Sequence, residues 1–80
     1  IMNTDSTEAQ TLDLRGLKCP LPILRTKKAL AQLESGSVLT VWATDPGAPD
    51  DFAAFCKHTG HTLMESSLHD EVFTLVIRHK

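Results

Sequence analysis

The sequence has few aromatic residues, few cysteines and no long apolar stretch. Tyrosine is absent, and the 80 residues include three phenylalanines, one tryptophan and two cysteines. No apolar run approaches the roughly 18 residues that a membrane-spanning helix needs, which excludes such a helix. The first ten residues are polar and acidic, so we expect no secretory signal peptide. Two cysteines without such a signal predict a cytoplasmic protein whose thiols stay reduced.

The chain is too short for more than one hydrophobic core. A domain of this length buries only about 60% of the surface that its extended chain exposes, so its core is small. Hydrophobic residues make up 41% of the sequence and charged residues 22%, which is typical of a globular domain rather than of a disordered chain. We therefore predict one domain over residues 11–80, preceded by a flexible tail over residues 1–10.

Charge is distributed unevenly along the chain. The formal net charge is −2, but residues 15–28 contain five basic residues and no acidic one. The rest of the chain has three basic residues against ten acidic ones. The basic set is either ordinary solvated surface or a docking surface for an acidic partner protein; its members are Arg15, Lys18, Arg25, Lys27 and Lys28. It is too small and too local to predict direct nucleic-acid binding.

Hydrophobic spacing predicts the element order β-α-β-α-β-β. Alternating patterns predict strands over residues 11–15, 37–44, 61–68 and 72–78. Helical spacing that begins near prolines predicts helices over residues 20–34 and 49–59. Strand–helix–strand units favour parallel neighbours, and the last two strands form an antiparallel hairpin. The predicted fold is an α/β (α+β) two-layer sandwich, in which two helices cover one face of a four-stranded mixed sheet.

Cys19 is the residue most suggestive of chemistry. It lies between a glycine-containing loop and the start of the first predicted helix, where Pro20 and Pro22 stiffen the first turn. A helix N-terminus stabilises anions, so we expect this position to lower the pKa of the thiol. We expect Arg15 and Lys18 to lie near the sulfur and to favour its anionic form. The alternative is that Cys19 is a small apolar residue at a helix start.

The second cysteine has a structural interpretation. Cys56 falls on the apolar stripe of the second predicted helix with Phe52 and Phe55, which predicts a buried position. A redox pair between Cys19 and Cys56 is the functional alternative. It requires Cα atoms within about 7 Å, and nothing in the sequence places them so.

The remaining polar clusters predict neither a metal site nor an acid–base pair. His58 and His61 form a His-x-x-His pair, whereas metal sites need three or four ligands. Asp45, Asp50 and Asp51 precede or begin the second helix, where carboxylates favour a helix start. We interpret them as helix-start residues rather than as a catalytic pair.

The motif around Cys19 resembles the signature of a known family. Arg15-Gly16-Leu17-Lys18-Cys19-Pro20-Leu21-Pro22, followed by Lys27-Lys28-Ala29-Leu30, is similar to the signature of the TusA/SirA family of small sulfur-carrier proteins. Further matches are Ala43-Thr44-Asp45-Pro46-Gly47, Asp51-Phe52, Phe55-Cys56, Thr59-Gly60-His61 and Phe73-Thr74-Leu75-Val76-Ile77-Arg78. The resemblance covers residues 11–80 and implies a two-layer α/β sandwich.

The resemblance also implies a chemistry for the site. Cys19 would accept a sulfane sulfur from a cysteine desulfurase or a rhodanese-like donor, hold it as a persulfide and pass it to a downstream acceptor protein. Such a protein is a sulfurtransferase that acts as a carrier; no cofactor is implied, and no histidine adjacent to Cys19 suggests an independent base. In one branch of the family the sulfur reaches the 2-thio group of tRNA wobble uridine. Leu21 departs from that branch, which tends to have an acidic or polar residue between the prolines.

Two other functions are compatible with the residues. One is a regulatory or interaction module that binds protein or RNA through the basic helix face. The other is a thiol redox sensor, in which peroxide oxidises Cys19 to a sulfenate or drives an intramolecular disulfide.

Overall fold

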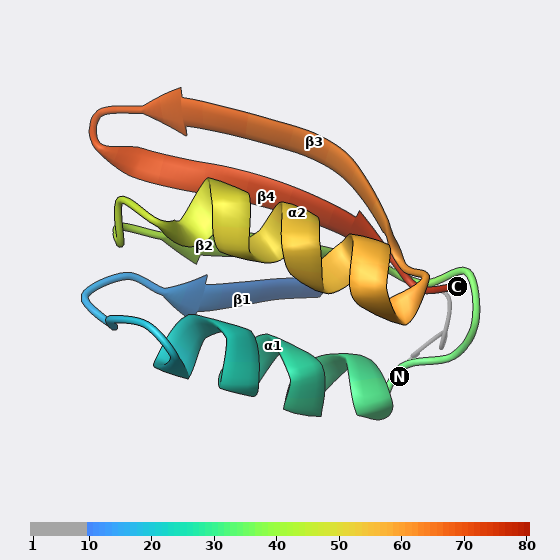
Figure 1. The fold of residues 1–80 in the computed structure, drawn as a ribbon. Coiled ribbons are helices and arrows are strands. Elements are labelled where there is room, and N and C mark those ends of the chain that lie inside the picture. The colour runs from blue at the N-terminus through green and yellow to red at the C-terminus, as the bar shows by residue number, and fades with distance from the viewer. Residues whose placement is uncertain (1–9) are drawn as a thin grey trace, which may run out of the picture.

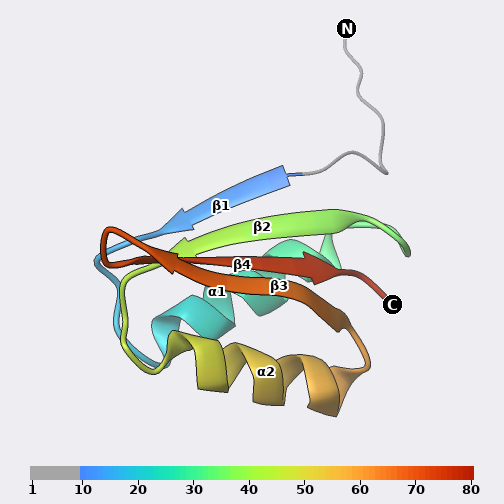
Figure 2. The same ribbon diagram turned by 90° about the horizontal axis from the view of Figure 1, so that it is seen from above.

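The four strands form one mixed sheet, and the two helices cover one of its faces (Figures 1 and 2). The computed structural model describes residues 10–80. Its elements are β1 (Gln10–Leu14), α1 (Leu21–Ala31), β2 (Val38–Ala43), α2 (Ala48–Thr59), β3 (Thr62–His69) and β4 (Val72–Arg78). The predicted order β-α-β-α-β-β is therefore confirmed. The predicted tail, residues 1–10, lies outside the described residues except for Gln10, which begins β1.

The sheet has the strand order β1-β2-β4-β3. β1 and β2 are parallel because α1 crosses between them, whereas β4 is antiparallel to both β2 and β3. The predicted two-layer mixed sandwich is thus confirmed. Within residues 10–80, no helix combines the length and the apolarity that crossing a membrane requires.

The core lies between the sheet and the helices. Alternation along β2 and β4 turns every second side chain toward the helices, which contribute apolar residues at helical spacing. The buried apolar side chains are Leu14, Leu30, Leu39, Val41, Ala43, Ala48, Phe52, Cys56, Leu75 and Ile77. Cys56 is only 3% exposed, so the prediction of a buried structural cysteine is confirmed.

α1 is shorter than predicted. It ends at Ala31 rather than at residue 34, because the backbone tightens into three-residue turns in which the Leu33 N–H donates to Leu30. Gly36, at φ 88°, does not cap the helix. Its N–H instead donates to the carbonyl of His79, which ties the start of β2 to the end of β4.

α1 and α2 both begin at the end of the molecule where the parallel strands β1 and β2 finish (Figure 1). The turn between β3 and β4 lies there as well, since β4 runs opposite to β2. We call this the cysteine end, made up of residues 15–20, 44–51 and 70–71. The Gly16 N–H donates to Thr44 Oγ1 at 2.8 Å and so joins the loop after β1 to the loop after β2.

Candidate functional site

Cys19 is an exposed free thiol at the cysteine end. It directly precedes Pro20, the N-cap residue of α1, and the peptide bond between them is cis. The chain turns into the helix as the Leu21 N–H donates to the Lys18 carbonyl at 2.9 Å. Pro22 occupies the first turn and is buried, so it anchors the helix start to the core. The sulfur is therefore presented to solvent from a braced position.

The electrostatic surroundings of Cys19 differ from the expectation. Desolvation raises the pKa of the Cys19 thiol above its ordinary value, and the charge of Asp51, a hydrogen bond to Asp51 and the charge of Asp45 raise it further. The prediction of a lowered thiol pKa was therefore wrong. The helix N-terminus is next to Cys19 in the sequence and could be anticipated. Asp45 and Asp51 are distant in sequence, in the loop after β2 and in α2, and only the fold brings them to the sulfur.

The two carboxylates both lie close to Gly47. A Cβ atom at this glycine would lie 3.4 Å from Asp45 Oδ2 and 3.5 Å from Asp51 Oδ2. Asp51 belongs to the first turn of α2, as predicted, and the N-cap residue of that helix is Gly47, which has no side chain to cap it. Asp45 and Asp51 are thus neighbours of the sulfur that the sequence analysis did not assign to the site. Parallel pairing of β1 and β2 gives the missing signal, because loops after adjacent parallel strands meet at one edge.

Arg15 does not lie against the Cys19 sulfur. Its guanidinium pairs with Asp13 through Nε–Oδ1 and Nη2–Oδ2 contacts of 2.8 Å each. It also lies 5.3 Å from the ring centroid of Trp42, on the sheet face that the helices leave uncovered. Asp13 and Trp42 are register partners in β1 and β2, so their side chains share that face. The Arg15 guanidinium is therefore engaged by Asp13, and a role for it in supporting the sulfur anion stays a prediction.

The other cations divide between two sides of α1. Arg25 and Lys28 line a groove of about 590 Å³ whose apolar residues include Leu21 and Leu24. Lys27 lines a different hollow with His61 and Lys80, away from the cysteine end. Lys18 is adjacent to Cys19 in sequence, and no contribution from it to the thiol pKa is among the causes of the shift. The five basic residues therefore do not form one patch around Cys19.

Two histidines, His61 and His79, meet at the end of the molecule opposite the cysteine end. His61 forms an edge contact with His79 at 4.7 Å between ring centroids, and burial together with the charges of His79 and Lys80 lowers the pKa of His61. Within residues 10–80, no group of three or more His, Cys, Asp or Glu side chains is arranged to hold a metal ion.

These observations define a class: a small two-layer α/β sandwich with one exposed cysteine at the start of its first helix and one buried cysteine in its core. The sequence matches the family model described as "Sulfurtransferase TusA" over residues 10–79, and the chain belongs to this family.

Known relatives agree over nearly the full length of the domain. A Neisseria meningitidis serogroup A protein named "Putative sulfur carrier protein" is 67% identical over 72 residues, which cover 90% of this chain and 97% of that protein. The sulfur carrier protein TusA of Allochromatium vinosum is 55% identical over 69 residues, covering 86% of this chain and 91% of that protein. The crystal structure of a SirA-like protein from Desulfitobacterium hafniense matches with a TM-score of 0.78 and 32% identity, over 86% of this chain and 95% of that chain.

Proposed function

We propose that this protein is a cytoplasmic sulfur carrier that holds one sulfane sulfur as a persulfide on Cys19. The observation that carries the proposal is the contrast between the two cysteines. Cys19 is exposed at the start of α1, whereas Cys56 is buried in the core. Membership of the TusA family and relatives named as sulfur carriers support this assignment.

The transfer is a thiol–persulfide exchange that needs no external oxidant or reductant. The Cys19 thiolate attacks the terminal sulfur of a persulfide on the donor, and an S–S bond forms as the donor's S–S bond breaks. The electron pair of the broken bond leaves on the donor cysteine, which departs as a thiolate. A thiolate of the acceptor then attacks the terminal sulfur on Cys19 in the same way, and Cys19 returns to its starting state.

The start of α1 is a local feature that favours a charged sulfur, and it acts against the effect of Asp51 and Asp45 on the resting thiol. A helix N-terminus stabilises a nearby anion by about 0.3–1 kcal/mol at an exposed position. The terminal sulfur of a persulfide lies about 2 Å beyond the Cys19 sulfur, one S–S bond length farther out. We therefore infer that loading makes the reactive atom more accessible to a partner than the resting thiol is.

The groove along α1 is the proposed contact for the sulfur donor, a cysteine desulfurase or a rhodanese-like protein. Leu21 and Leu24 are 43% and 54% exposed, and Arg25 and Lys28 line the same groove. Apolar area flanked by two cations fits an acidic, partly apolar face of another protein. Such docking weakens as the salt concentration rises.

A sulfur-loading assay tests the carrier role. The protein is incubated with free cysteine and a purified cysteine desulfurase, and its intact mass is measured without reductant. We expect a mass increase of one sulfur atom in the wild type and in Cys56→Ala, but not in Cys19→Ser. An adduct that persists in Cys19→Ser would overturn the assignment. So would an unloaded wild type when the Allochromatium vinosum relative is loaded in parallel.

The end product that we propose to test first is the 2-thio group of tRNA wobble uridine. Cells that lack the gene are complemented with the wild type or with Cys19→Ser, and nucleosides from total tRNA are quantified. Rescue of 2-thiouridine by the wild type alone supports this acceptor route. An unchanged level of 2-thiouridine in the deletion strain would show that the sulfur goes to a different acceptor.

A further inference from the structure

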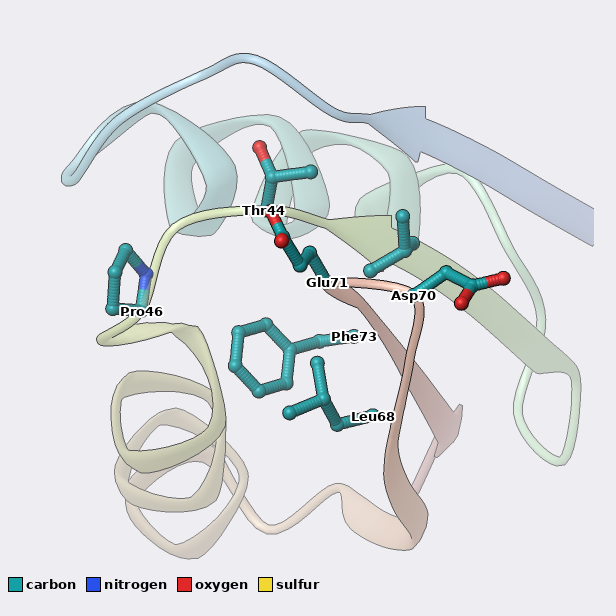
Figure 3. Close-up of a pocket in the computed structure, with 7 residues that line it drawn as sticks. Thr44, Pro46, Leu68, Asp70, Glu71 and Phe73 are labelled. Atoms are coloured by element: carbon teal, nitrogen blue, oxygen red, sulfur yellow. The ribbon is translucent and has the colours of Figure 1, made fainter.

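A pocket of about 450 Å³ opens at the cysteine end, between the loop after β2 and the turn that joins β3 to β4. Most of its exposed lining is apolar. Figure 3 shows Phe73 and Leu68 next to each other, with Pro46 across from them. Its lining residues are Thr44, Pro46, Leu68, Asp70, Glu71, Val72 and Phe73. The pocket uses neither Cys19 nor the α1 groove.

The apolar surface of this pocket is left uncovered by the fold. Leu68 is 60% exposed near the end of the edge strand β3, and its register partner Phe73 is only partly buried. α2 covers β3 and β4 farther along the strands but begins beside Pro46 (Figures 1 and 3). Exposed apolar area rimmed by polar residues is typical of a protein–protein contact.

The rim of the pocket is acidic. Asp70 and Glu71, both exposed side chains of the turn between β3 and β4, line it directly. Asp70 contacts His69 at 3.4 Å, but both side chains are 89% exposed, so a stronger cation can displace the histidine. This charge complements a lysine or an arginine on the occupant.

The two acidic residues of the rim, Asp70 and Glu71, occupy a turn whose backbone conformation favours other residue types. His69 pairs with Val72, so Asp70 and Glu71 form a two-residue hairpin loop, with φ values of 50° and 65°. Such a turn strongly favours Asn-Gly, and glutamate is uncommon at positive φ. Backbone strain of this kind is often found at binding sites, where it is retained for function.

We propose that this pocket is a docking site for a partner protein that inserts an aromatic or long aliphatic side chain flanked by lysine or arginine. The inference rests on the proposed function, because the pocket shares the cysteine end with Cys19 and the partner is then one that exchanges sulfur with it. The pocket and the basic α1 groove have opposite charge. They therefore recognise partner surfaces of opposite character, which lets the carrier distinguish one partner from another.

Short peptides serve as probes of the pocket. Acetyl-Lys-Phe-Lys-amide is titrated into ¹⁵N-labelled protein at low salt and followed by NMR. We expect saturable shifts of the Leu68, Val72 and Phe73 amides, with weaker binding of acetyl-Lys-Ala-Lys-amide and acetyl-Glu-Phe-Glu-amide. Shifts centred elsewhere, absence of shifts at millimolar peptide, or equal binding of the three peptides would overturn the proposal.

Two pairs of variants separate docking from folding. The double variant Asp70→Asn/Glu71→Gly suits the turn better, so its melting temperature should rise while peptide affinity falls about 3- to 30-fold. Leu68→Ala should also weaken binding, whereas Met64→Ala should not, because Met64 is a similarly exposed residue of β3 that lies outside the pocket. Affinity unchanged in the double variant, or lowered equally by Leu68→Ala and Met64→Ala, would contradict the site.

The test is independent of sulfur loading. Peptide binding is also measured on Cys19→Ser, which cannot form the persulfide and should bind the peptide like the wild type. If Cys19 is loaded but the peptide does not bind, the docking site is wrong and the carrier role stands. If the peptide binds the pocket but Cys19 is not loaded, the carrier role fails and the pocket remains a docking surface without a sulfur-exchanging partner.

Discussion

The Asp51 carboxylate, in the first turn of α2, raises the pKa of the Cys19 thiol, which lies just ahead of α1. Partial desolvation and the nearby charge of Asp45 raise this pKa further, so the resting thiol ionises less readily than an ordinary exposed cysteine. A protonated thiol is a poor nucleophile and is oxidised slowly. The structure thus describes a resting state in which Cys19 is accessible but weakly reactive. A cation on a partner protein that neutralises Asp51 would raise the reactivity of Cys19.

Replacing Asp51 should make Cys19 more reactive. In Asp51→Asn the carboxylate charge is gone, so the thiol pKa should fall toward its ordinary value and the thiolate fraction at pH 7 should rise. Each unit of lowered pKa increases that fraction about tenfold. The rate of alkylation by iodoacetamide, measured from pH 6 to pH 10, reports the pKa directly.

Asp50→Asn provides the matched control. Asp50 also lies in the first turn of α2, but it is not among the groups that shift the Cys19 pKa. Its alkylation profile should follow that of the wild type. If both variants shift the profile equally, the effect belongs to the general charge of the α2 start and the specific Asp51 contact is disproved.

The ion pair on the uncovered face of the sheet should be visible in an acid titration. Hydrogen bonds from the Arg15 side chain and backbone, together with its charge, lower the pKa of Asp13 from 3.8 to about 2. A carboxyl group whose pKa is lower in the folded state than in the unfolded chain stabilises the fold at pH values above its unfolded pKa. This contribution is lost as the pH falls from about 4 toward 2. A ¹³C NMR titration of the Asp13 carboxyl group measures this pKa.

Arg15→Gln should return the Asp13 pKa to its ordinary range. The difference in melting temperature between the wild type and this variant should then narrow below pH 4. Arg78→Gln, at the end of β4, should leave Asp13 near 2. An Asp13 pKa that is unchanged in Arg15→Gln would show that Arg15 is not the cause.

Thr26 offers a stabilising substitution in α1. Its side chain is fully buried, and within residues 10–80 its Oγ1 has no hydrogen-bond partner. An unsatisfied buried hydroxyl is costly, so Thr26→Val should raise the free energy of unfolding by about 1 kcal/mol or more. Urea denaturation monitored by circular dichroism measures the change.

Thr59 is the control for this effect because its hydroxyl is satisfied. Thr59 Oγ1 donates to the Phe55 carbonyl at 2.8 Å, so Thr59→Val should lower the free energy of unfolding by about 1 kcal/mol. Opposite signs are expected for the two substitutions. A loss of stability in both would mean that Thr26 has a hydrogen-bonding role that the structure does not show.

The sequence predicted the layers of the fold because each element satisfies its local pattern and its tertiary role at once. Leu39, Val41 and Ala43 alternate in the sequence and are all buried against the helices. Phe52 and Cys56 are four residues apart and face the same core. Local propensity and global packing agree at these positions, so the pattern alone identified them.

The candidate site was predicted only in part, because its electrostatics arise from contacts that are distant in sequence. The position of Cys19 ahead of a proline-braced helix could be inferred from neighbouring residues. The contacts of Asp51 with Cys19, and of Arg15 with Asp13 and Trp42, depend on how strands and loops pack. Arg15 was expected at the sulfur, but the alternation of β1 directs Asp13 to the opposite face, and Arg15 follows its carboxylate.

The direction of the first and last strands of the chain has a practical consequence for attaching other modules. β1 begins and β4 finishes at the side of the domain remote from Cys19 (Figure 1). A fluorescent tag, a surface tether or a fused enzyme attached after β4, at Lys80, is therefore directed away from the thiol. Immobilised protein should consequently keep its reactive sulfur free, which suits single-molecule and surface-plasmon measurements of partner exchange.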